Sequence, residues 1–418
     1  MNKRGYSVGA LKTQVVKRVW GFLDKQSHNY RMMIVRTSGA HFFYNMTGQY
    51  TSIYTKALGA DNILIGLISS FSAFVSMVIS MPVGYITDKY NLRYVLGAGM
   101  FLNIVMIGLY AFAHDWKWIF IAMAINPLTM ALMFRSQQVI ITNGLRDEDR
   151  ATGMGLRMQL AYLVGIISPV LAAFIVNYFG GLTAEGIRPL FYIRLLGLIV
   201  VYSFVFLKTD NIEPAPRVNT STGFVQDFKD VIEFGGRKLK TMIVVGALGA
   251  FVWSILENFA FLYAEEIKGA DELVLGLMPT CETVAYLLFS TTMNRLADTR
   301  GRKYAFITVR PSLWLSFILA IIARSPYWLL VAWFLRGIAL STSAYDTMFM
   351  ELVPAEQRGR WMGLSNTFSA MMRIVAPIVG GFLYDSRLPW LIFAIPLVID
   401  MLLRIPILYR WIPETLTT

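Results

Sequence analysis

GADNILIGL, at residues 59–67, recurs 210 residues later as GADELVLGL, at residues 269–277. The same offset aligns Asp88 with Asp298 and Tyr94 with Tyr304, and an offset of 208 aligns Arg150 with Arg358, residues 154–156 with 362–364, and Pro169 with Pro377. Chance similarity between apolar stretches does not explain charged, glycine and proline positions that keep their register across five predicted helices. The sequence therefore predicts a tandem repeat.

Long apolar segments recur on both sides of this repeat. A helix needs about 20 residues to cross the hydrocarbon core. We predict twelve crossings, at residues 32–57, 62–87, 93–113, 117–141, 154–178, 189–208, 240–264, 272–297, 304–323, 326–350, 361–384 and 389–410. Helices of a soluble protein would show polar outer faces, which most of these segments lack. The composition, 56% hydrophobic and 15% charged, agrees with an all-α integral membrane protein.

Lys and Arg are distributed unevenly between the predicted loops. The six loops on one side hold one each: Lys56, Lys117, Arg188, Lys268, Arg324 and Arg387. The other side holds most of the rest, so the positive-inside rule makes it cytoplasmic and places both termini there. This topology also accounts for the net charge of +12 without nucleic acid. We expect a multi-pass protein of the plasma membrane.

The longest polar stretch, residues 209–239, divides the chain into six spans and six spans. We predict an N-terminal cytoplasmic segment (1–31), an N-terminal bundle (32–208), a cytoplasmic central loop (209–239) and a C-terminal bundle (240–418). An even number of spans per repeat keeps both halves the same way up, so the bundles are related by an axis normal to the membrane. Residues 11–23 favour an amphipathic helix on the membrane surface, with an ordinary basic tail as the alternative. Residues 224–234 predict a short helix in the central loop.

A charged motif occurs twice, in the loops after the second and eighth spans. Residues 84–93 read GYITDKYNLR, and residues 294–303 read NRLADTRGRK. Both resemble the G-x-x-x-D-[RK]-x-G-[RK]-[RK] loop of the major facilitator superfamily, and the resemblance covers essentially the whole chain. Asn91 replaces a glycine, which we interpret as tolerable because asparagine also adopts left-handed conformations. Leu92 replaces a basic residue.

The resemblance implies the major facilitator fold, with two pseudo-symmetric six-helix bundles, and a conformational latch at these loops. In the latch, the aspartates accept charge-assisted hydrogen bonds from arginines or from a helix N-terminus. The predicted latch residues are Gly84, Asp88, Lys89, Arg93, Asp298, Arg300, Gly301 and Arg302. The alternative is a solvated charged turn that only sets the topology.

A second motif of the superfamily, G-P-x-x-G-G in the fifth helix, is associated with antiporters that export drugs. Residues 168–173 read SPVLAA, and residues 376–381 read APIVGG, which is closer. We predict helix kinks at Pro169 and Pro377 and close packing at Gly380 and Gly381. The resemblance is thus to the drug:proton antiporter branch, and packing alone is the alternative.

Polar residues inside the spans are candidates for a cavity wall, because such residues are costly in lipid. The resemblance implies that helices one, four, seven and ten line a central cavity. The candidates for the substrate cavity are Tyr44, Asn45, Gln49, Arg135, Trp253, Asn258, Arg336, Asp346 and Arg373. The superfamily's arginine early in helix four is not found, and Arg135 lies deeper. Arg135 and Arg373 would suit an anionic substrate group or could hold carboxylates.

Glu257, Glu282 and His41 are the candidates for proton coupling. A carboxyl group takes up a proton in a dry cavity and can release it when the cavity opens to water. The alternative for the glutamates is a structural ion pair with Arg373 or Arg336. His41 could titrate near neutral pH or serve as a hydrogen-bonded wall residue.

Four further charged residues lie on predicted outer helices, and none is assigned to the site. Asp400 and Arg404 are four residues apart and are predicted to pair with each other. Arg194 and Arg310 lie near span ends, so we expect their side chains to snorkel toward the membrane surface.

No enzyme constellation appears, and no Walker A loop indicates ATP coupling. Three histidines and one cysteine favour no metal site, and we predict no cofactor. The chain is predicted to be a secondary transporter that works by alternating access. The most specific prediction is proton-coupled export of amphipathic small molecules by a monomer, with the substrate, protons and the bilayer as partners. The alternatives are transport of organic anions or other metabolites, a lipid flippase, and a membrane sensor on the same scaffold.

Overall fold

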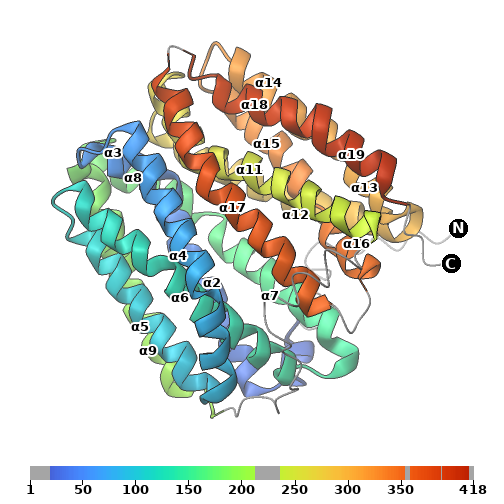
Figure 1. Ribbon diagram of the computed structural model, residues 1–418. Coiled ribbons are helices and arrows are strands. Elements are labelled where there is room, and N and C mark those ends of the chain that lie inside the picture. Colours follow the sequence, from blue (N-terminus) through green and yellow to red (C-terminus); the bar gives the residue numbers. More distant parts are fainter. Residues whose placement is uncertain (1–18, 212–235, 354–357, 387, 414–418) are drawn as a thin grey trace, which may run out of the picture.

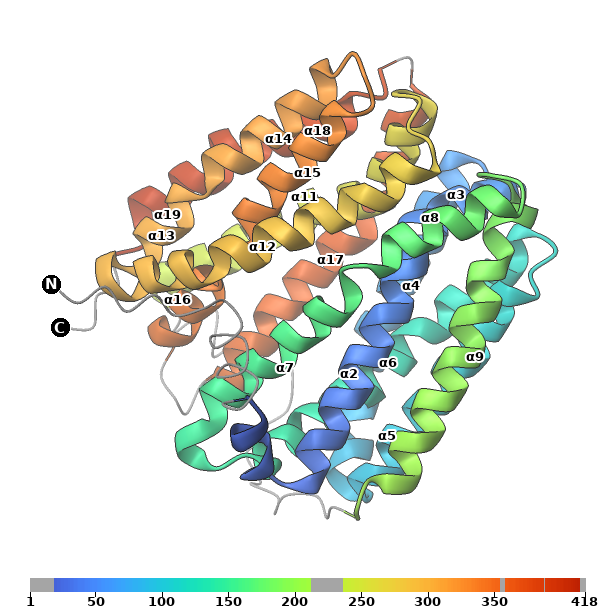
Figure 2. The same ribbon diagram turned by 180° about the vertical axis from the view of Figure 1, so that it is seen from behind.

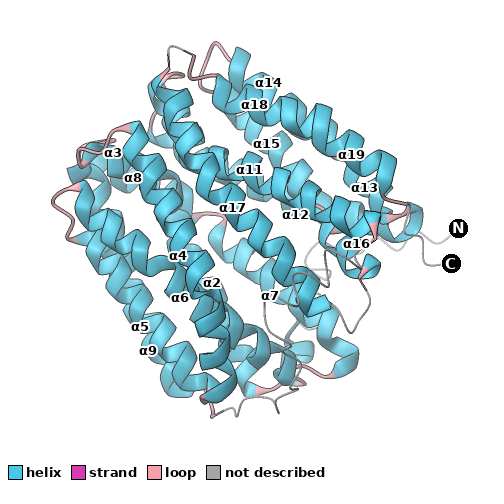
Figure 3. Cartoon of the chain, in the orientation of Figure 1, coloured by secondary structure: helices cyan, strands magenta, loops and turns pink. Residues whose placement is uncertain are grey.

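The computed structural model describes residues 19–211, 236–353, 358–386 and 388–413, and in these ranges the regular structure is helical (Figure 3). The helical runs that form the crossings are α2 (His28–Thr47) with η1 (Gly48–Tyr50) and α3 (Thr51–Ala57), α4 (Asn62–Lys89), α5 (Leu92–Ala111), α6 (Trp116–Gly144), α7 (Arg150–Gly165) with α8 (Ser168–Tyr178), α9 (Ala184–Lys208), α11 (Arg237–Glu266), α12 (Glu272–Arg300), α13 (Arg302–Thr308) with α14 (Arg310–Ile322), α15 (Trp328–Leu340) with α16 (Ala344–Leu352), α17 (Arg358–Asp385), and α18 (Leu391–Val398) with η4 (Ile399–Arg404) and α19 (Ile405–Trp411).

Eleven of these runs are long and apolar enough to cross a membrane, counted over the described residues. The twelfth crossing is the first in the chain, from His28 to Ala57, which carries more polar residues than the others. The predicted fold class is confirmed, and each observed run overlaps its predicted span. The predicted surface helix lies mostly outside the described residues, although residues 19–24 are helical, and the central-loop helix lies wholly outside them.

The helices form two halves: the N half, α2 to α9, and the C half, α11 to α19 (Figures 1 and 2). Helix α4 packs along α17, and α8 packs against α12, so each half contributes one helix to each contact. We name the end where α9 finishes and α11 begins the central-loop face. The opposite end, with the turns at residues 58–61 and 267–271, is the far face.

The repeated motif builds the same turn and helix start in both halves. Gly59 and Gly269 have φ values of +93° and +68°, a region that favours glycine because it has no Cβ. The aspartate two residues later then caps the next helix. Asp61 Oδ1 accepts from the Leu64 amide at 2.7 Å, and Asp271 Oδ1 accepts from the Val274 amide at 2.8 Å.

The last glycine of the motif lets the two halves touch. A Cβ on Gly276 would lie 2.5 Å from the carbonyl oxygen of Pro169, and a Cβ on Gly66 would collide with the carbonyl oxygen of Pro377. Gly66 and Gly276 are repeat equivalents, and so are the two prolines. Each half therefore presents its glycine to the proline of the other half.

The two prolines have different effects on their helices. Helix α7 ends at Gly165 and α8 begins at Ser168, so the fifth crossing is interrupted just before Pro169. Helix α17 runs from Arg358 to Asp385 with Pro377 inside it. Gly380 lies against the Phe259 ring, and Gly381 lies against the backbone of Asn62, as close packing requires.

The two charged loops differ in backbone conformation. Gly301 has φ +105°, which accounts for a glycine there. Asn91, at the equivalent position, has φ −55°, so our interpretation of it as a left-handed residue is wrong. Its side chain instead accepts a hydrogen bond from the Arg93 amide at 3.0 Å and caps α5.

Candidate functional site

A polar seam closes the two halves against each other at the far face. Lys56 Nζ lies 2.5 Å from Glu266 Oε1, and the Tyr384 hydroxyl donates to Glu266 Oε2 at 2.9 Å. Asn62 Nδ2 donates to Asp385 Oδ1 at 2.5 Å, again from one half to the other. The Lys56–Glu266 and Asn62–Asp385 bonds join the two halves and must break before the far face can open, whereas the Tyr384 bond lies within the C half.

Charge reversal tests the part that the seam plays. Lys56→Glu places a carboxylate beside Glu266 and should shift the protein toward a far face that is open. Spin labels on Lys117→Cys and Arg324→Cys, in a Cys281→Ala background, should report a longer distance between the halves. A partly exposed pair contributes about 1 kcal/mol or less, so a shift in populations is expected rather than loss of the fold.

The exchanged pair, Lys56→Glu with Glu266→Lys, provides the control for this measurement. It restores the attraction with the signs reversed and should return the label distance to that of the unmutated charge pair. An unchanged distribution in the Lys56→Glu variant would show that the seam does not hold the face shut.

Two further hydrogen bonds join the halves, and a small cavity lies beside one of them. Ser69 donates to Asn258 Oδ1 at 2.5 Å across the halves, and the Tyr50 hydroxyl donates to the Glu272 carbonyl oxygen at 3.0 Å. A cavity of about 40 Å³ lies beside Ser69 and Asn258, with Thr51 and Thr55 also in its wall. Asn258, a predicted cavity residue, is thus part of the closed end.

Glu257 lies next to this closed end, on α11. Its side chain is exposed, and it forms no ion pair or hydrogen bond with a residue in the described part of the chain. Its charge interacts with those of Arg373 and Arg336 and with the Tyr44 hydroxyl of the N half. Tyr44 is 51% exposed although it belongs to the first crossing. Glu257 therefore lies within electrostatic range of three predicted cavity residues.

Glu282 has a direct partner. Its Oε2 lies 3.3 Å from Arg336 Nε, and both side chains are largely buried. The Arg336 guanidinium also lies over the Trp253 ring, 4.6 Å from its centroid. For Glu282 the ion-pair alternative therefore describes the structure, and Trp253 stacks on the partner arginine.

His41 belongs to an aromatic path between the halves. Its Nε2 lies 3.2 Å from Asn45 Nδ2, and its ring meets Tyr162 edge-on at 5.0 Å. The ring centroid of Tyr162 in turn lies 4.7 Å from that of Tyr286, on α12 of the C half. A Cβ on Gly165 would lie 2.7 Å from the His41 ring, so glycine brings α7 close to α2 here.

The remaining predicted cavity residues are more dispersed. Gln49 is buried, and its Nε2 has no hydrogen-bond partner among the described residues. Arg135 is exposed on α6. Asp346 is exposed on α16, and the charge that acts on it is that of Arg404.

The predicted latch is described in full for its second copy only. In the first copy Arg93 is described, whereas the surroundings of Gly84 and the side chains of Asp88 and Lys89 are not. In the second copy, Asp298 pairs with Arg302, which also binds Glu351 Oε1 at 3.1 Å. These bonds stay within the C half. The first-copy Arg93 donates to Asn211 at 3.5 Å, and Arg300 donates to the Tyr304 hydroxyl at 3.4 Å.

The outer arginines correct one prediction and confirm another. Arg194 and Arg310 are each 8% exposed, so they do not snorkel. Arg194 Nη1 donates to Thr47 Oγ1 at 2.5 Å, and its guanidinium faces the Tyr44 ring. The predicted pair is present: Arg404 Nη1 donates to Asp400 Oδ1 at 3.1 Å. Arg194 therefore lies beside the site. Its position in the sequence did not indicate this.

Sequence reasoning also missed a polar cluster in the N half, made of Arg36, Thr37, Gln137 and Arg157. Arg157 and Gln137 both donate to Thr37 Oγ1, at 3.2 Å and 2.7 Å, and Arg36 donates to Gln137. Arg36 and Arg157 lie near the cytoplasmic ends of their predicted spans, where arginines are common. What distinguishes them is that their partners, Gln137 and Thr37, are bonded to each other.

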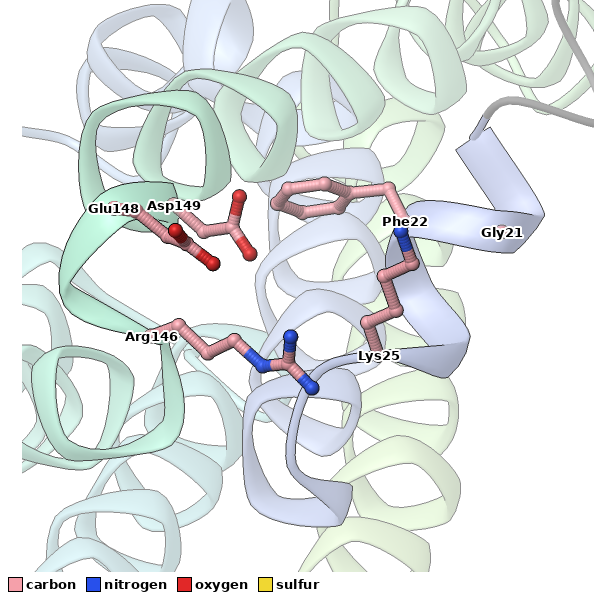
Figure 4. A pocket seen from close by; sticks show the side chains of 6 residues that line it. All are labelled: Gly21, Phe22, Lys25, Arg146, Glu148 and Asp149. Carbon is pink, nitrogen blue, oxygen red and sulfur yellow. The ribbon is translucent and has the colours of Figure 1, made fainter.

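A separate pocket of about 400 Å³ opens near the central-loop face (Figure 4). Its wall combines Gly21, Phe22 and Lys25 with Arg146, Glu148 and Asp149 from the segment between α6 and α7. Asp149 also accepts from Gln26 Nε2 at 2.7 Å, which ties these two segments together. Its lining residues come from the N half and from the segment just before it, so the pocket is not part of the site between the halves.

A helical membrane fold of two repeat-related halves, with ionisable side chains where they meet, defines a membrane transporter. The family model of the Major Facilitator Superfamily matches residues 37–276 and 242–418. The chain belongs to that superfamily, as its charged loops indicated.

Similar proteins include transporters from bacteria and archaea. The Quinolone resistance protein NorA of Staphylococcus aureus (strain COL) is 19% identical over 342 residues, covering 80% of this chain and 84% of NorA. An uncharacterised MFS-type transporter of Methanocaldococcus jannaschii is 22% identical over 348 residues, covering 80% and 85%. Among solved structures, the nucleoside transporter NupG (D323A mutant) has a TM-score of 0.75 at 13% identity, covering 91% of this chain and 99% of NupG. A POT family transporter in complex with 5-aminolevulinic acid has a TM-score of 0.71 at 14% identity, covering 92% and 96%. At these identities the solved structures show the shared fold alone.

Proposed function

We propose that this transporter exports amphipathic small molecules in exchange for protons. The observation that carries the proposal is the position of Glu257. This carboxyl group is exposed, interacts electrostatically with Tyr44 of the opposite half, and has no ion-pair partner among the described residues. An unpaired carboxylate is too costly to enclose, so it takes a proton when water is excluded. Opening to the other side then lets water return and the proton leave.

Two features support exchange with an amphipathic substrate. Aromatic side chains surround the ionisable ones, namely Tyr44, Trp253, Tyr162 and Tyr286. Such a lining offers apolar contact area together with polar atoms. A relative whose name describes quinolone resistance, NorA, has similar sequence over most of its length.

A second candidate function is transport of organic anions or other metabolites. Arg373 is exposed on α17 and interacts with Glu257. If Glu257 were neutralised by a proton, Arg373 would be left to bind an anionic group. An anion transporter should be harmed more by neutralising Arg373, whereas a proton-coupled exporter should be harmed more by neutralising Glu257.

We also infer the arrangement in the membrane from the distribution of positive charge. The central-loop face is cytoplasmic, with both termini there, and the protein acts as a monomer in the plasma membrane. The four predicted regions, 1–31, 32–208, 209–239 and 240–418, serve as surface segment, bundle, linker and bundle.

Proteoliposomes with an imposed pH gradient test the proposed function. Lipophilic cations and organic anions would be screened as substrates, with a dye that reports internal pH. Substrate should move against the proton flow, and internal pH should change only when substrate is present. Substrate flux that ignores the gradient would exclude proton coupling. Lipid movement without solute flux would identify a flippase, and the absence of both fluxes would indicate a sensor.

A further inference from the structure

The N half contains buried and half-buried arginines that its own spans cannot neutralise. Between the first and last turns of its six crossings there is no Asp or Glu. Arg36, Arg157 and Arg194 nevertheless lie inside these crossings. The C half differs, since Glu282 pairs with Arg336 and Asp400 with Arg404.

A chain of hydrogen bonds through Gln137 and Thr37 connects Arg36 to Arg157. Thr37 Oγ1 donates its proton to the Met33 carbonyl oxygen at 2.7 Å and accepts from Arg157 and Gln137. A hydroxyl has one proton and two lone pairs, so Thr37 has no capacity left. Gln137 Oε1 accepts from Arg36, so the amide is held between Arg36 and the Thr37 hydroxyl.

Each guanidinium still has a donor with nothing to bind. The Nε atoms of Arg36 and Arg157 are buried and have no hydrogen-bond partner. Arg36 is only 7% exposed, so water does not readily replace a partner. A buried polar group without a partner is unfavourable, and a buried charge without a counter-charge is more so.

The two positive charges also act on each other. Arg36 and Arg157 are near enough for their charges to repel, and the described residues around them supply no carboxylate. Gln137 and Thr37 provide neutral acceptors only. An oxyanion would add negative charge and hydrogen-bond acceptors at the same place, which is why arginine pairs suit carboxylate and phosphate groups.

The cluster adjoins the site between the halves. Thr37 and His41 are four residues apart on α2 and therefore lie on the same face. Helix α7 supplies Arg157 and then Tyr162, which contacts His41. Figure 2 shows α7 and α2 side by side, and α6, which carries Gln137, also packs against α2.

We propose that Arg36, Arg157, Thr37 and Gln137 form a subsite that binds a carboxylate or phosphate group on the transported molecule. This rests on the proposed transport of amphipathic small molecules and narrows their class to organic anions. The aromatic residues beside His41 would face the apolar part of such a molecule. Arg36 and Arg157 bind the anion, and Thr37 and Gln137 position them.

Calorimetry on the full-length protein in phosphatidylcholine nanodiscs tests the subsite. The probes are 2-naphthoate, 2-naphthyl phosphate and the neutral 2-naphthamide, which share one aromatic body. The anions should bind about tenfold or more tightly than the amide, because charge-assisted hydrogen bonds discriminate strongly. Arg157→Gln and Arg36→Gln should each abolish this preference.

Variants of the same cluster separate binding from folding. Arg157→Lys keeps the charge but loses the planar fork, so it should retain part of the preference. Thr37→Val should weaken anion binding several-fold even if Arg36→Gln fails to fold. Arg188→Gln is the matched control, because Arg188 binds the Ala113 carbonyl oxygen at 2.9 Å elsewhere in the same half.

Equal binding of anions and amide by the unaltered protein would overturn the subsite, and so would the absence of anion binding. Retention of the preference in both glutamine variants would do the same. The assay needs no gradient. Proton-driven transport of neutral amphiphiles without anion preference would therefore reject the subsite and leave the proposed function standing. Anion binding without proton coupling would support the subsite and reject the proposed function.

Discussion

Replacing Glu257 by glutamine is expected to reduce pH-driven transport to the level of empty vesicles. Glutamine keeps the size and polarity of the side chain but cannot carry a proton at any accessible pH. Glu257 is exposed and has no ion-pair partner among the described residues. It can therefore change charge without breaking an existing bond.

Glu282→Gln should have a different effect. Glu282 already pairs with Arg336 at 3.3 Å, so its loss leaves a largely buried arginine without its direct ion-pair partner. Removing one partner of a buried pair costs about 3–5 kcal/mol. We therefore expect a lower thermal stability for Glu282→Gln, with any remaining folded protein still responding to the gradient.

Two assays on the same vesicles decide between coupling and general damage. Substrate exchange at equal pH on both sides requires no proton movement and should survive in Glu257→Gln. Glu185→Gln is the control, because Glu185 is an exposed carboxylate at the start of α9. Gradient-driven transport that persists in Glu257→Gln would remove Glu257 from the coupling step.

Replacing Gly66 or Gly276 by leucine is expected to abolish transport by keeping the far face from closing. Gly276 lets α12 approach the Pro169 carbonyl oxygen, and a Cβ there would lie 2.5 Å from it. A Cβ on Gly66 would lie still closer to the Pro377 carbonyl oxygen. Real Cβ atoms do not tolerate such contacts, so the helices must separate. Alternating access requires both faces to close in turn, so a face that cannot close stops the cycle.

The label pair on residues 117 and 324 measures this separation directly. Both leucine variants should lengthen the distance and suppress flux, whereas Gly108→Leu should do neither. Gly108 lies on α5, and no atom lies within 4 Å of a Cβ built on it. A Gly276→Leu protein with unchanged distance and normal flux would show that the glycine–proline contact is dispensable.

Much of the architecture could be predicted because it depends on local patterns. The spans follow from runs of apolar residues, whose cost in water is proportional to the area that they expose. The motif at residues 59–67 predicted the repeat because a positive-φ glycine, a capping aspartate and a packing glycine each require a particular residue type. Glu257 could be singled out because a carboxyl group within an apolar span is rare.

Other parts of the site could not be predicted, because they depend on which side chains meet across helices. The sequence placed Arg194 at a membrane edge, yet the fold buries it against Thr47. Glu257 and Glu282 look alike in sequence, but of the two only Glu282 forms an ion pair with Arg336 among the described residues. The conformation of Asn91 also depends on its neighbours, because its side chain accepts a hydrogen bond from the Arg93 amide and caps α5.

The sequence by itself determined that the chain crosses the bilayer in twelve spans and folds as two equivalent halves. Hydropathy and backbone restrictions act over a few residues and need no knowledge of distant partners. Only the tertiary structure decided which carboxylate is paired, which arginines are left without a counter-charge, and which face is closed. Those properties depend on distances of 3–4 Å between helices far apart in the chain, and electrostatic and steric energies change steeply over such distances.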